Sequence, residues 1–158
     1  SGYFDEVSGE LAVAMKNQIW LSILVHEYSH LTQWLDNCDA WIEGCKGLPK
    51  VDAWLEGNGV RGIKKALAQT RELELDNEKR SVKLIKKFDL PIDVKAYTKR
   101  ANAYVFFYTY LAETRKWCNP NNSPYSNKAI LRIMPDRFLR DYSVIPDNIY
   151  DTFVEQKI

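Results

Sequence analysis

Two histidines and a glutamate in the order H-E-x-x-H are the residues whose types and spacing could do chemistry in this 158-residue chain. His26 and His30 are four residues apart, so on a helix their Cβ atoms lie about 5–6 Å apart on one face, and both imidazoles can reach one metal ion. Glu27 would stand beside that ion and could take a proton from a water molecule that the ion activates. The motif therefore predicts a zinc site with Glu27 as the catalytic base.

A catalytic zinc ion usually has three protein ligands and one open position for water. The chain contains no third histidine, so a carboxylate or a thiolate must supply the remaining ligand. The longer motif H-E-x-x-H-x-x-G-x-x-H is excluded, because Gln33 and Asp36 occupy the positions where it requires glycine and histidine.

The element that must position the motif is a helix from about Lys16 to Asn37, which no proline or glycine interrupts. Apolar residues occupy two of its sides, so we expect the helix to be buried between the core and a cleft. One apolar side points away from the histidines and is formed by Leu24, Tyr28, Leu31 and Leu35. The other flanks the histidine face and is formed by Ile19, Ile23 and Trp34.

A second helix is predicted from about Arg61 to Phe88. At 3.6 residues per turn, Glu74 and Glu78 fall within an otherwise apolar stripe. An ionised carboxylate in such a stripe needs a cation or strong hydrogen-bond donors, and zinc with its histidines is a suitable partner. The opposite side of this helix is expected to be solvated and carries Glu72, Asp76, Lys79 and Lys83.

The rest of the chain predicts a single α+β domain, residues 1–158, in which helices dominate. Residues 10–15 form either a short strand or the first turn of the long helix. Residues 38–62 are rich in glycine and are expected to be irregular, and residues 119–126 form a turn-rich loop. Further helices are expected at about 92–117, 128–134 and 147–154.

The two predicted helices together resemble the gluzincin group of zinc metallopeptidases. In that group a second helix supplies a glutamate, often as E-x-x-x-D or E-x-x-x-E followed by a small residue, and here Glu74-Leu-Asp-Asn-Glu78-Lys-Arg-Ser81 is similar to this pattern. The chain also resembles short zincins of the ImmA/IrrE kind and small phage-encoded metallopeptidase-like proteins. By this resemblance Glu74 is the third zinc ligand and Glu78 orients a ligand histidine.

The resemblance implies a minimal zincin-like core with an edge strand near the cleft, which favours a strand for residues 10–15. The chain departs from the pattern at Glu78, where Asp is more usual, and by a competing Glu72-x-x-x-Asp76 in the same helix. Helical phase favours Glu74, because Glu72 lies about 160° away from it around the helix axis.

The reaction implied is zinc-dependent hydrolysis of a peptide bond, in which Glu27 moves the proton of the attacking water. A hydrogen-bond donor must also stabilise the oxyanion that forms on the carbonyl. Because no histidine is left for this role, the candidates are tyrosine and arginine. We expect Tyr104 or Tyr108 on the third helix, with Arg115 and Tyr125 as further candidates.

The net charge and the distribution of apolar residues bear on which kinds of molecule the protein binds. Lys+Arg 22 against Asp+Glu 21 gives a net charge of +1, which provides no electrostatic argument for nucleic acid or an anionic membrane. No apolar run is long enough to cross a membrane. The expected partner is therefore a protein or peptide substrate. An inactive zinc-binding or protein-interaction module, and a structural domain in which the motif is accidental, remain open as alternatives.

Cysteine usage bears on the compartment. The three cysteines form no C-x-x-C pair and no even set, which predicts free thiols in a reducing compartment, the cytoplasm of a bacterial or phage-infected cell. A bridge between Cys38 and Cys45 in an exported protein is the alternative.

Overall fold

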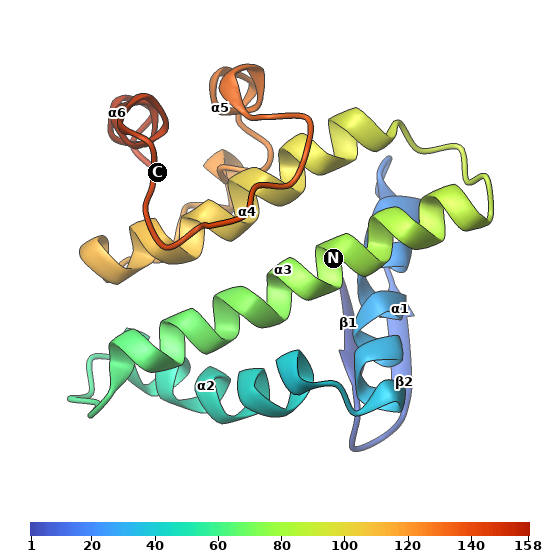
Figure 1. Ribbon diagram of the computed structural model, residues 1–158, viewed down its shortest axis with the longest axis horizontal. Coiled ribbons are helices and arrows are strands. Elements are labelled where there is room, and N and C mark those ends of the chain that lie inside the picture. The colour runs from blue at the N-terminus through green and yellow to red at the C-terminus, as the bar shows by residue number, and fades with distance from the viewer.

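The computed structural model describes residues 1–158 and is dominated by six α-helices, with one small antiparallel sheet (Figure 1). The predicted helix-dominated α+β class is confirmed. The strands are β1 (Gly2–Asp5) and β2 (Glu10–Val13). The helices are α1 (Trp20–Asp36), α2 (Asp39–Leu55), α3 (Ile63–Lys87), α4 (Val94–Thr114), α5 (Lys128–Ile133) and α6 (Asp147–Glu155).

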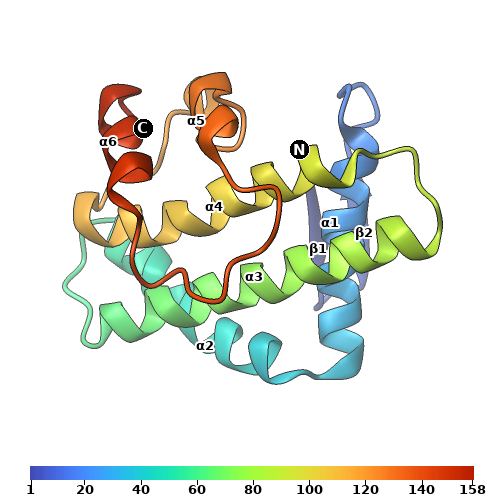
Figure 2. The same cartoon turned by 45° about the horizontal axis from the view of Figure 1, so that its top comes forward.

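The longest helix, α3, lies in the middle of the molecule and contacts α1, α2 and α4. Figures 1 and 2 show α2 and α4 on different sides of α3, and α1 crossing α3 toward its C-terminal end. The short helix α5 packs on α4 and α6. Because α1 and α3 cross, side chains from the two predicted motif helices can meet.

The main hydrophobic core lies between α3, α4 and the C-terminal segments. It is centred on Phe106 and Phe107, which are fully buried, and α6 adds Phe153 to it. A smaller cluster joins α1, α3 and α4 and consists of Val25, Val82, Ile85, Tyr97 and Ala101. Burial of apolar surface stabilises the packing of α4 against α3 by about 25 cal/mol for each Å² buried. By contrast, Val25 is the one apolar residue of α1 that is buried.

The helix α1 is not buried on its apolar side as we expected. Its buried residues are Val25, Ser29 and Gln33, so a largely polar stripe faces α3. On the side that we expected to face the core, Tyr28 is 44% and Leu35 65% exposed, and Leu24 and Leu31 are only partly buried. The expectation was wrong because the stripe beside the histidines packs on α3 and rotates the apolar side toward solvent.

The β-hairpin covers the other apolar flank of α1. Gly2 pairs with Val13 across the hairpin, and a Cβ atom at Gly2 would lie 2.6 Å from Cγ2 of Ile23, so the strand runs very close to the helix. The ring of Phe4 lies 5.9 Å from that of Trp34. The strand expected within residues 10–15 is confirmed as β2, whereas β1 was not predicted.

The segment 38–62, expected to be irregular, contains the helix α2 with Pro49 inside it. Gly44 and Gly47 are buried where α2 approaches α3. A Cβ atom at Gly44 would lie 2.6 Å from Cβ of Leu73, and one at Gly47 would lie 2.7 Å from the Ala66 carbonyl oxygen. These two glycines therefore permit close helix packing and do not form turns, which is why the prediction was wrong.

Replacing Gly44 by Ala should destabilise the protein. Overpacking costs about 1–3 kcal/mol, which exceeds the roughly 1 kcal/mol that alanine gains over glycine within a helix. Gly59→Ala is the control, because nothing lies within 4 Å of a Cβ atom there. Calorimetry should show a lower melting temperature for Gly44→Ala alone, and equal melting temperatures would contradict the close packing of α2 on α3.

The remaining predicted helices are confirmed with small shifts at their ends. The side chain of Asp93 caps α4 by accepting hydrogen bonds from the backbone N–H groups of Lys95 and Ala96. The three cysteines are free thiols, so Cys38 and Cys45 form no bridge. None of the helices combines the length and the apolar character that crossing a membrane requires.

Candidate metal centre

The two motif histidines on α1 and one glutamate on α3 meet where the helices cross. The Nε2 atom of His26 lies 3.8 Å from Oε2 of Glu74, and the Nε2 atom of His30 lies 3.6 Å from the same oxygen. The potential ligand atoms of the three residues all lie within 4.8 Å of one another. Sequence and fold thus bring a His-His-Glu cluster within metal-binding distance.

Small polar side chains permit the close crossing of α1 and α3. The hydroxyl groups of Ser29 and Ser81 lie 2.8 Å apart and form a hydrogen bond between the two helices, and both residues are fully buried. Ser29 immediately precedes His30 and also donates to the Val25 carbonyl. This contact lies where the two helices cross and involves neither imidazole.

Glu74 and Glu72, the two candidates for the third metal ligand, have different surroundings in the structure. Glu74 is 6% exposed and faces the histidines, whereas Glu72 is exposed and lies 3.4 Å from the side chain of Arg71. Asp76, which we expected to be solvated, has a side chain that is 38% exposed and that also accepts a hydrogen bond from Gln33 on α1. The expectation was right only in part, because α1 crosses α3 on this side as well.

Glu78 lies behind His26. Its Oε1 atom is 3.1 Å from Nδ1 of His26, and the residue is 5% exposed. The side-chain amide of Asn77 also lies 3.0 Å from this Nδ1, and rotating it by 180° would turn its unpaired Oδ1, an acceptor, toward the ring. A carboxylate that accepts the Nδ1 proton leaves the lone pair of His26 on Nε2, the atom directed at Glu74, and makes that nitrogen a stronger ligand.

Replacing Glu78 by Ala should weaken zinc binding about 10–100-fold, the usual cost of losing a group that orients a ligand histidine. Glu78→Gln should cost less, because an amide oxygen can still accept the proton of His26. Competition with a chelator of known affinity gives both constants. Wild-type affinity in Glu78→Ala would show that this carboxylate has no influence on the ligand.

The electrostatics of the cluster require positive charge between its carboxylates. Burial works against a charged His26, but the charges of Glu78 and Glu74 outweigh it and raise the pKa of His26 to about 9. Burial alone would raise the pKa of Glu74, but the neighbouring His30 and His26 and the Tyr104 hydroxyl hold it below its usual value. A protonated imidazole or a metal ion can supply this charge.

An unpaired atom in the cluster matches a metal ion. Oε2 of Glu74, which lies within 3.8 Å of Nε2 of both histidines, is buried and has no hydrogen-bond partner. A buried, unpaired carboxylate oxygen is costly. Two imidazole nitrogens and one carboxylate oxygen are also a ligand set found in catalytic zinc sites. The residues of the cluster therefore fit a metal ion.

Glu27 stands next to this cluster without being part of it. It is half-buried beneath the hairpin, and a Cβ atom at Gly2 would lie 3.1 Å from its Cγ. Burial raises the pKa of Glu27 above its usual value, and the charges of His26 and His30 offset this only in part. A carboxylate with a raised pKa beside a metal position suits the role of a general base.

Two tyrosines of α4, Tyr104 and Tyr108, lie close to the cluster. The ring of Tyr104 lies 6.2 Å from that of His26, and its hydroxyl is 3.0 Å from the hydroxyl of Tyr108. Burial, together with the charge of Glu74, raises the pKa of both well above the usual value, so both stay protonated donors. Tyr125 packs against Tyr104 at 5.4 Å. Tyr104 is therefore the tyrosine nearest to the histidines, and Tyr108 holds its hydroxyl.

Arg115, also a candidate for the oxyanion, is bound elsewhere. Its guanidinium donates to the carbonyl oxygens of Trp54 and Asn58 and lies over the Trp54 ring. This contact ties the C-terminal end of α4 to the end of α2. Arg115 thus has a structural partner and does not take part in the cluster.

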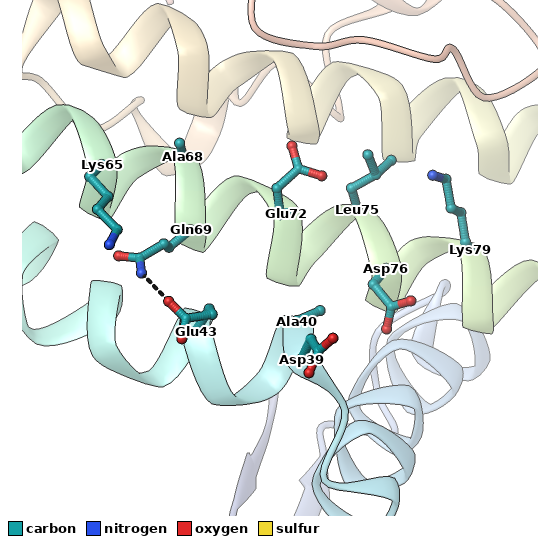
Figure 3. Close-up of a pocket in the computed structure, with 10 residues that line it drawn as sticks. All are labelled: Asp39, Ala40, Glu43, Lys65, Ala68, Gln69, Glu72, Leu75, Asp76 and Lys79. Atoms are coloured by element: carbon teal, nitrogen blue, oxygen red, sulfur yellow. Dashed lines mark hydrogen bonds between the residues drawn. The ribbon is translucent and has the colours of Figure 1, made fainter.

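A groove of about 500 Å³ between α2 and α3 is separate from the cluster (Figure 3). None of His26, His30 and Glu74 lines it. Its lining consists of Asp39, Ala40, Glu43, Lys65, Ala68, Gln69, Glu72, Leu75, Asp76 and Lys79. The groove is therefore a different place from the cluster, and of its lining residues Asp76 also contacts Gln33 of α1.

Two residues near the cluster, Gln33 and Asn77, were not found from the sequence. They contact the Nδ1 atoms of the two histidines. Gln33 carried a signal, since three residues after His30 it falls on the same helix face. Trp41 lies in the segment that was expected to be irregular, where packing under a loop and a place in a substrate wall were both possible roles. In the structure its ring lies 6.3 Å from that of His30.

The feature of the structure that bears on function is thus the cluster itself, in which three potential ligand atoms converge with the Glu27 carboxylate and the Tyr104 hydroxyl nearby. Comparison of the chain with protein-family models, with curated proteins and with solved structures found no match.

Proposed function

We propose that this protein is a zinc-dependent metallopeptidase of the gluzincin type, with His26, His30 and Glu74 as the zinc ligands. The observation that carries the proposal is the convergence of both Nε2 atoms on the unpaired Oε2 of Glu74. Imidazole and carboxylate together suit zinc, and three protein ligands leave the fourth position open for water, as in catalytic sites.

A zinc ion bound there would polarise the scissile carbonyl and lower the pKa of a water molecule. Glu27 accepts a proton from that water as its oxygen bonds to the carbonyl carbon. It then delivers the proton to the nitrogen of the amine that leaves when the C–N bond breaks. One water is consumed for each peptide bond, and Glu27 returns to its starting charge.

Tyr104 is proposed to stabilise the oxyanion. Its ring lies 6.2 Å from that of His26, it remains protonated, and its hydroxyl is held by Tyr108 at 3.0 Å. A donor placed before the reaction needs no reorganisation when negative charge develops on the carbonyl oxygen. Tyr108 contributes by orienting Tyr104 and is not proposed to contact the substrate.

The proposed substrate is a protein or peptide. The aromatic ring of Trp41 beside His30, with Phe4 at 6.1 Å from it, offers apolar surface next to the metal position. We also infer a reducing compartment such as the cytoplasm, because free thiols such as Cys38, Cys45 and Cys118 are typical of proteins there.

Metal removal tests the function directly. The zinc-loaded protein should cleave members of a broad peptide library, analysed by mass spectrometry, and treatment with a chelator should stop the cleavage. Adding zinc back should restore it. Cleavage that resists the chelator would contradict the proposal, and a protein that binds zinc but cleaves no peptide would be an inactive zinc-binding module.

A further inference from the structure

The side chain of Gln33 connects His30 to the α3 backbone. Its Oε1 atom lies 2.8 Å from Nδ1 of His30. Its Nε2 atom donates to the Leu73 carbonyl oxygen at 3.0 Å and to Oδ2 of Asp76 at 2.8 Å. Gln33 is fully buried, so its amide group itself is shielded from water.

These contacts determine which way the amide of Gln33 points. A carbonyl oxygen and a carboxylate oxygen only accept hydrogen bonds, so the two N–H groups of the amide must face Leu73 and Asp76. Rotating the amide by 180° would place its oxygen against the Leu73 carbonyl oxygen and Oδ2 of Asp76. All three oxygens would then face one another without a donor. The oxygen of Gln33 is therefore held toward His30.

The orientation of Gln33 in turn determines the tautomer of His30. An amide oxygen accepts a hydrogen bond but cannot donate one, so Nδ1 of His30 must carry the proton. The lone pair of the neutral ring is then on Nε2, which faces Glu74. Neutral imidazole in this tautomer is the form that binds a metal through Nε2.

Asp76 is held in place by charge. Nε of Arg80 donates to its Oδ2 atom at 2.7 Å, and Nη1 of Arg80 donates to Oδ2 of Asp36 at 2.5 Å. Asp36 and Gln33 belong to α1, whereas Asp76 and Arg80 belong to α3. The chain of contacts thus closes on itself across the helix crossing, and Gln33 cannot reorient without breaking it.

We propose that Gln33 is a positioning residue of the metal centre, which fixes His30 with its proton on Nδ1 and its Nε2 lone pair toward the metal, an inference that rests on the proposed zinc site. Glu78 does the same for His26 with a carboxylate. The two ligands are thus supported by different chemistry, a charged acceptor behind His26 and a neutral amide behind His30.

The test compares Gln33→Met, which keeps the approximate size of the side chain but removes the amide, with Ser81→Ala. Ser81→Ala removes a different buried hydrogen bond between α1 and α3, the one to Ser29, and touches neither imidazole. A purely structural role for Gln33 predicts that both variants lose stability and that neither changes His30.

Two measurements separate the roles. In metal-free protein, ¹H–¹⁵N correlation spectra of the histidine rings, recorded about two pH units above the ordinary histidine pKa of about 6.5, should place the His30 proton on Nδ1 in the wild type and on Nε2 in Gln33→Met. The chain has two histidines, so assignment is simple. Zinc affinity from chelator competition should fall about 10–100-fold in Gln33→Met and stay within about twofold of wild type in Ser81→Ala.

A rescue variant keeps the test decisive if Gln33→Met folds poorly. Gln33→Glu retains an oxygen acceptor toward His30 while changing the contacts with Leu73 and Asp76, so the proton should stay on Nδ1. Loss of that proton in the rescue variant, or its retention on Nδ1 in Gln33→Met, would overturn the inference. The tautomer of His30 is measured without metal, so the two proposals can fail separately. A wild-type protein that binds no zinc would refute the proposed function, and the spectra would still show whether Gln33 determines the tautomer of His30.

Discussion

Replacing Glu27 by Gln should abolish peptide hydrolysis while leaving the zinc content unchanged. A positioned general base contributes about 10²–10⁴-fold to rate, and an amide cannot accept the proton of the attacking water. Glu27 lies outside the His-His-Glu cluster, so its loss removes no ligand. The measurement is kcat/KM on the best peptide from the library, together with zinc per chain by mass spectrometry.

Glu113→Gln is the matched control, because Glu113 is an exposed residue near the C-terminal end of α4 and has no part in the cluster. It should retain the wild-type kcat/KM. If Glu27→Gln lost its zinc, Glu27 would be a ligand and not the base. If it retained full activity, the proton would be moved by another group.

Replacing Glu74 by Ala should reduce zinc affinity by more than the 10–100-fold that is typical for a residue behind a ligand, because it removes one of three proposed ligand atoms. Glu72→Ala provides the control on the same helix, two residues away. Glu72 is exposed and its partner is Arg71, so its removal should have almost no effect on zinc affinity.

Titration of both variants with zinc in the presence of a competing chelator gives the order of effects. Glu78→Ala should fall between them. A variant Glu74→Ala that binds zinc as tightly as wild type, or a Glu72→Ala that loses it, would mean that α3 presents a different face to α1 than the structure has.

The position of Glu74 could be predicted because helical phase is a local property of the sequence. The stripe that contains Thr70, Glu74 and Ser81 repeats at 3.6 residues, and this periodicity held along the whole of α3. The same kind of reasoning failed for α1. There the apolar side with Tyr28 and Leu35 is exposed, since the partner of α1 is the polar stripe on α3 and not a hydrophobic core.

Two other features depended on contacts between distant segments. Gly44 and Gly47 look like turn residues in the sequence, and only the approach of α2 to Leu73 and Ala66 gives them their role in close packing. Gln33 was informative in the sequence only because it excluded the longer zinc motif. Its contact with His30 could have been predicted from their spacing, but its orientation depends on Leu73 and Asp76, 40 and 43 residues away.

The central claim is that His26, His30 and Glu74 bind one zinc ion between them. Diffraction from crystals of the zinc-loaded protein, recorded on both sides of the zinc absorption edge, tests this most directly. We predict one anomalous peak per chain, about 2.0–2.2 Å from Nε2 of His26, Nε2 of His30 and a carboxylate oxygen of Glu74. The absence of a peak at this position, or a peak held by other residues, would contradict the account.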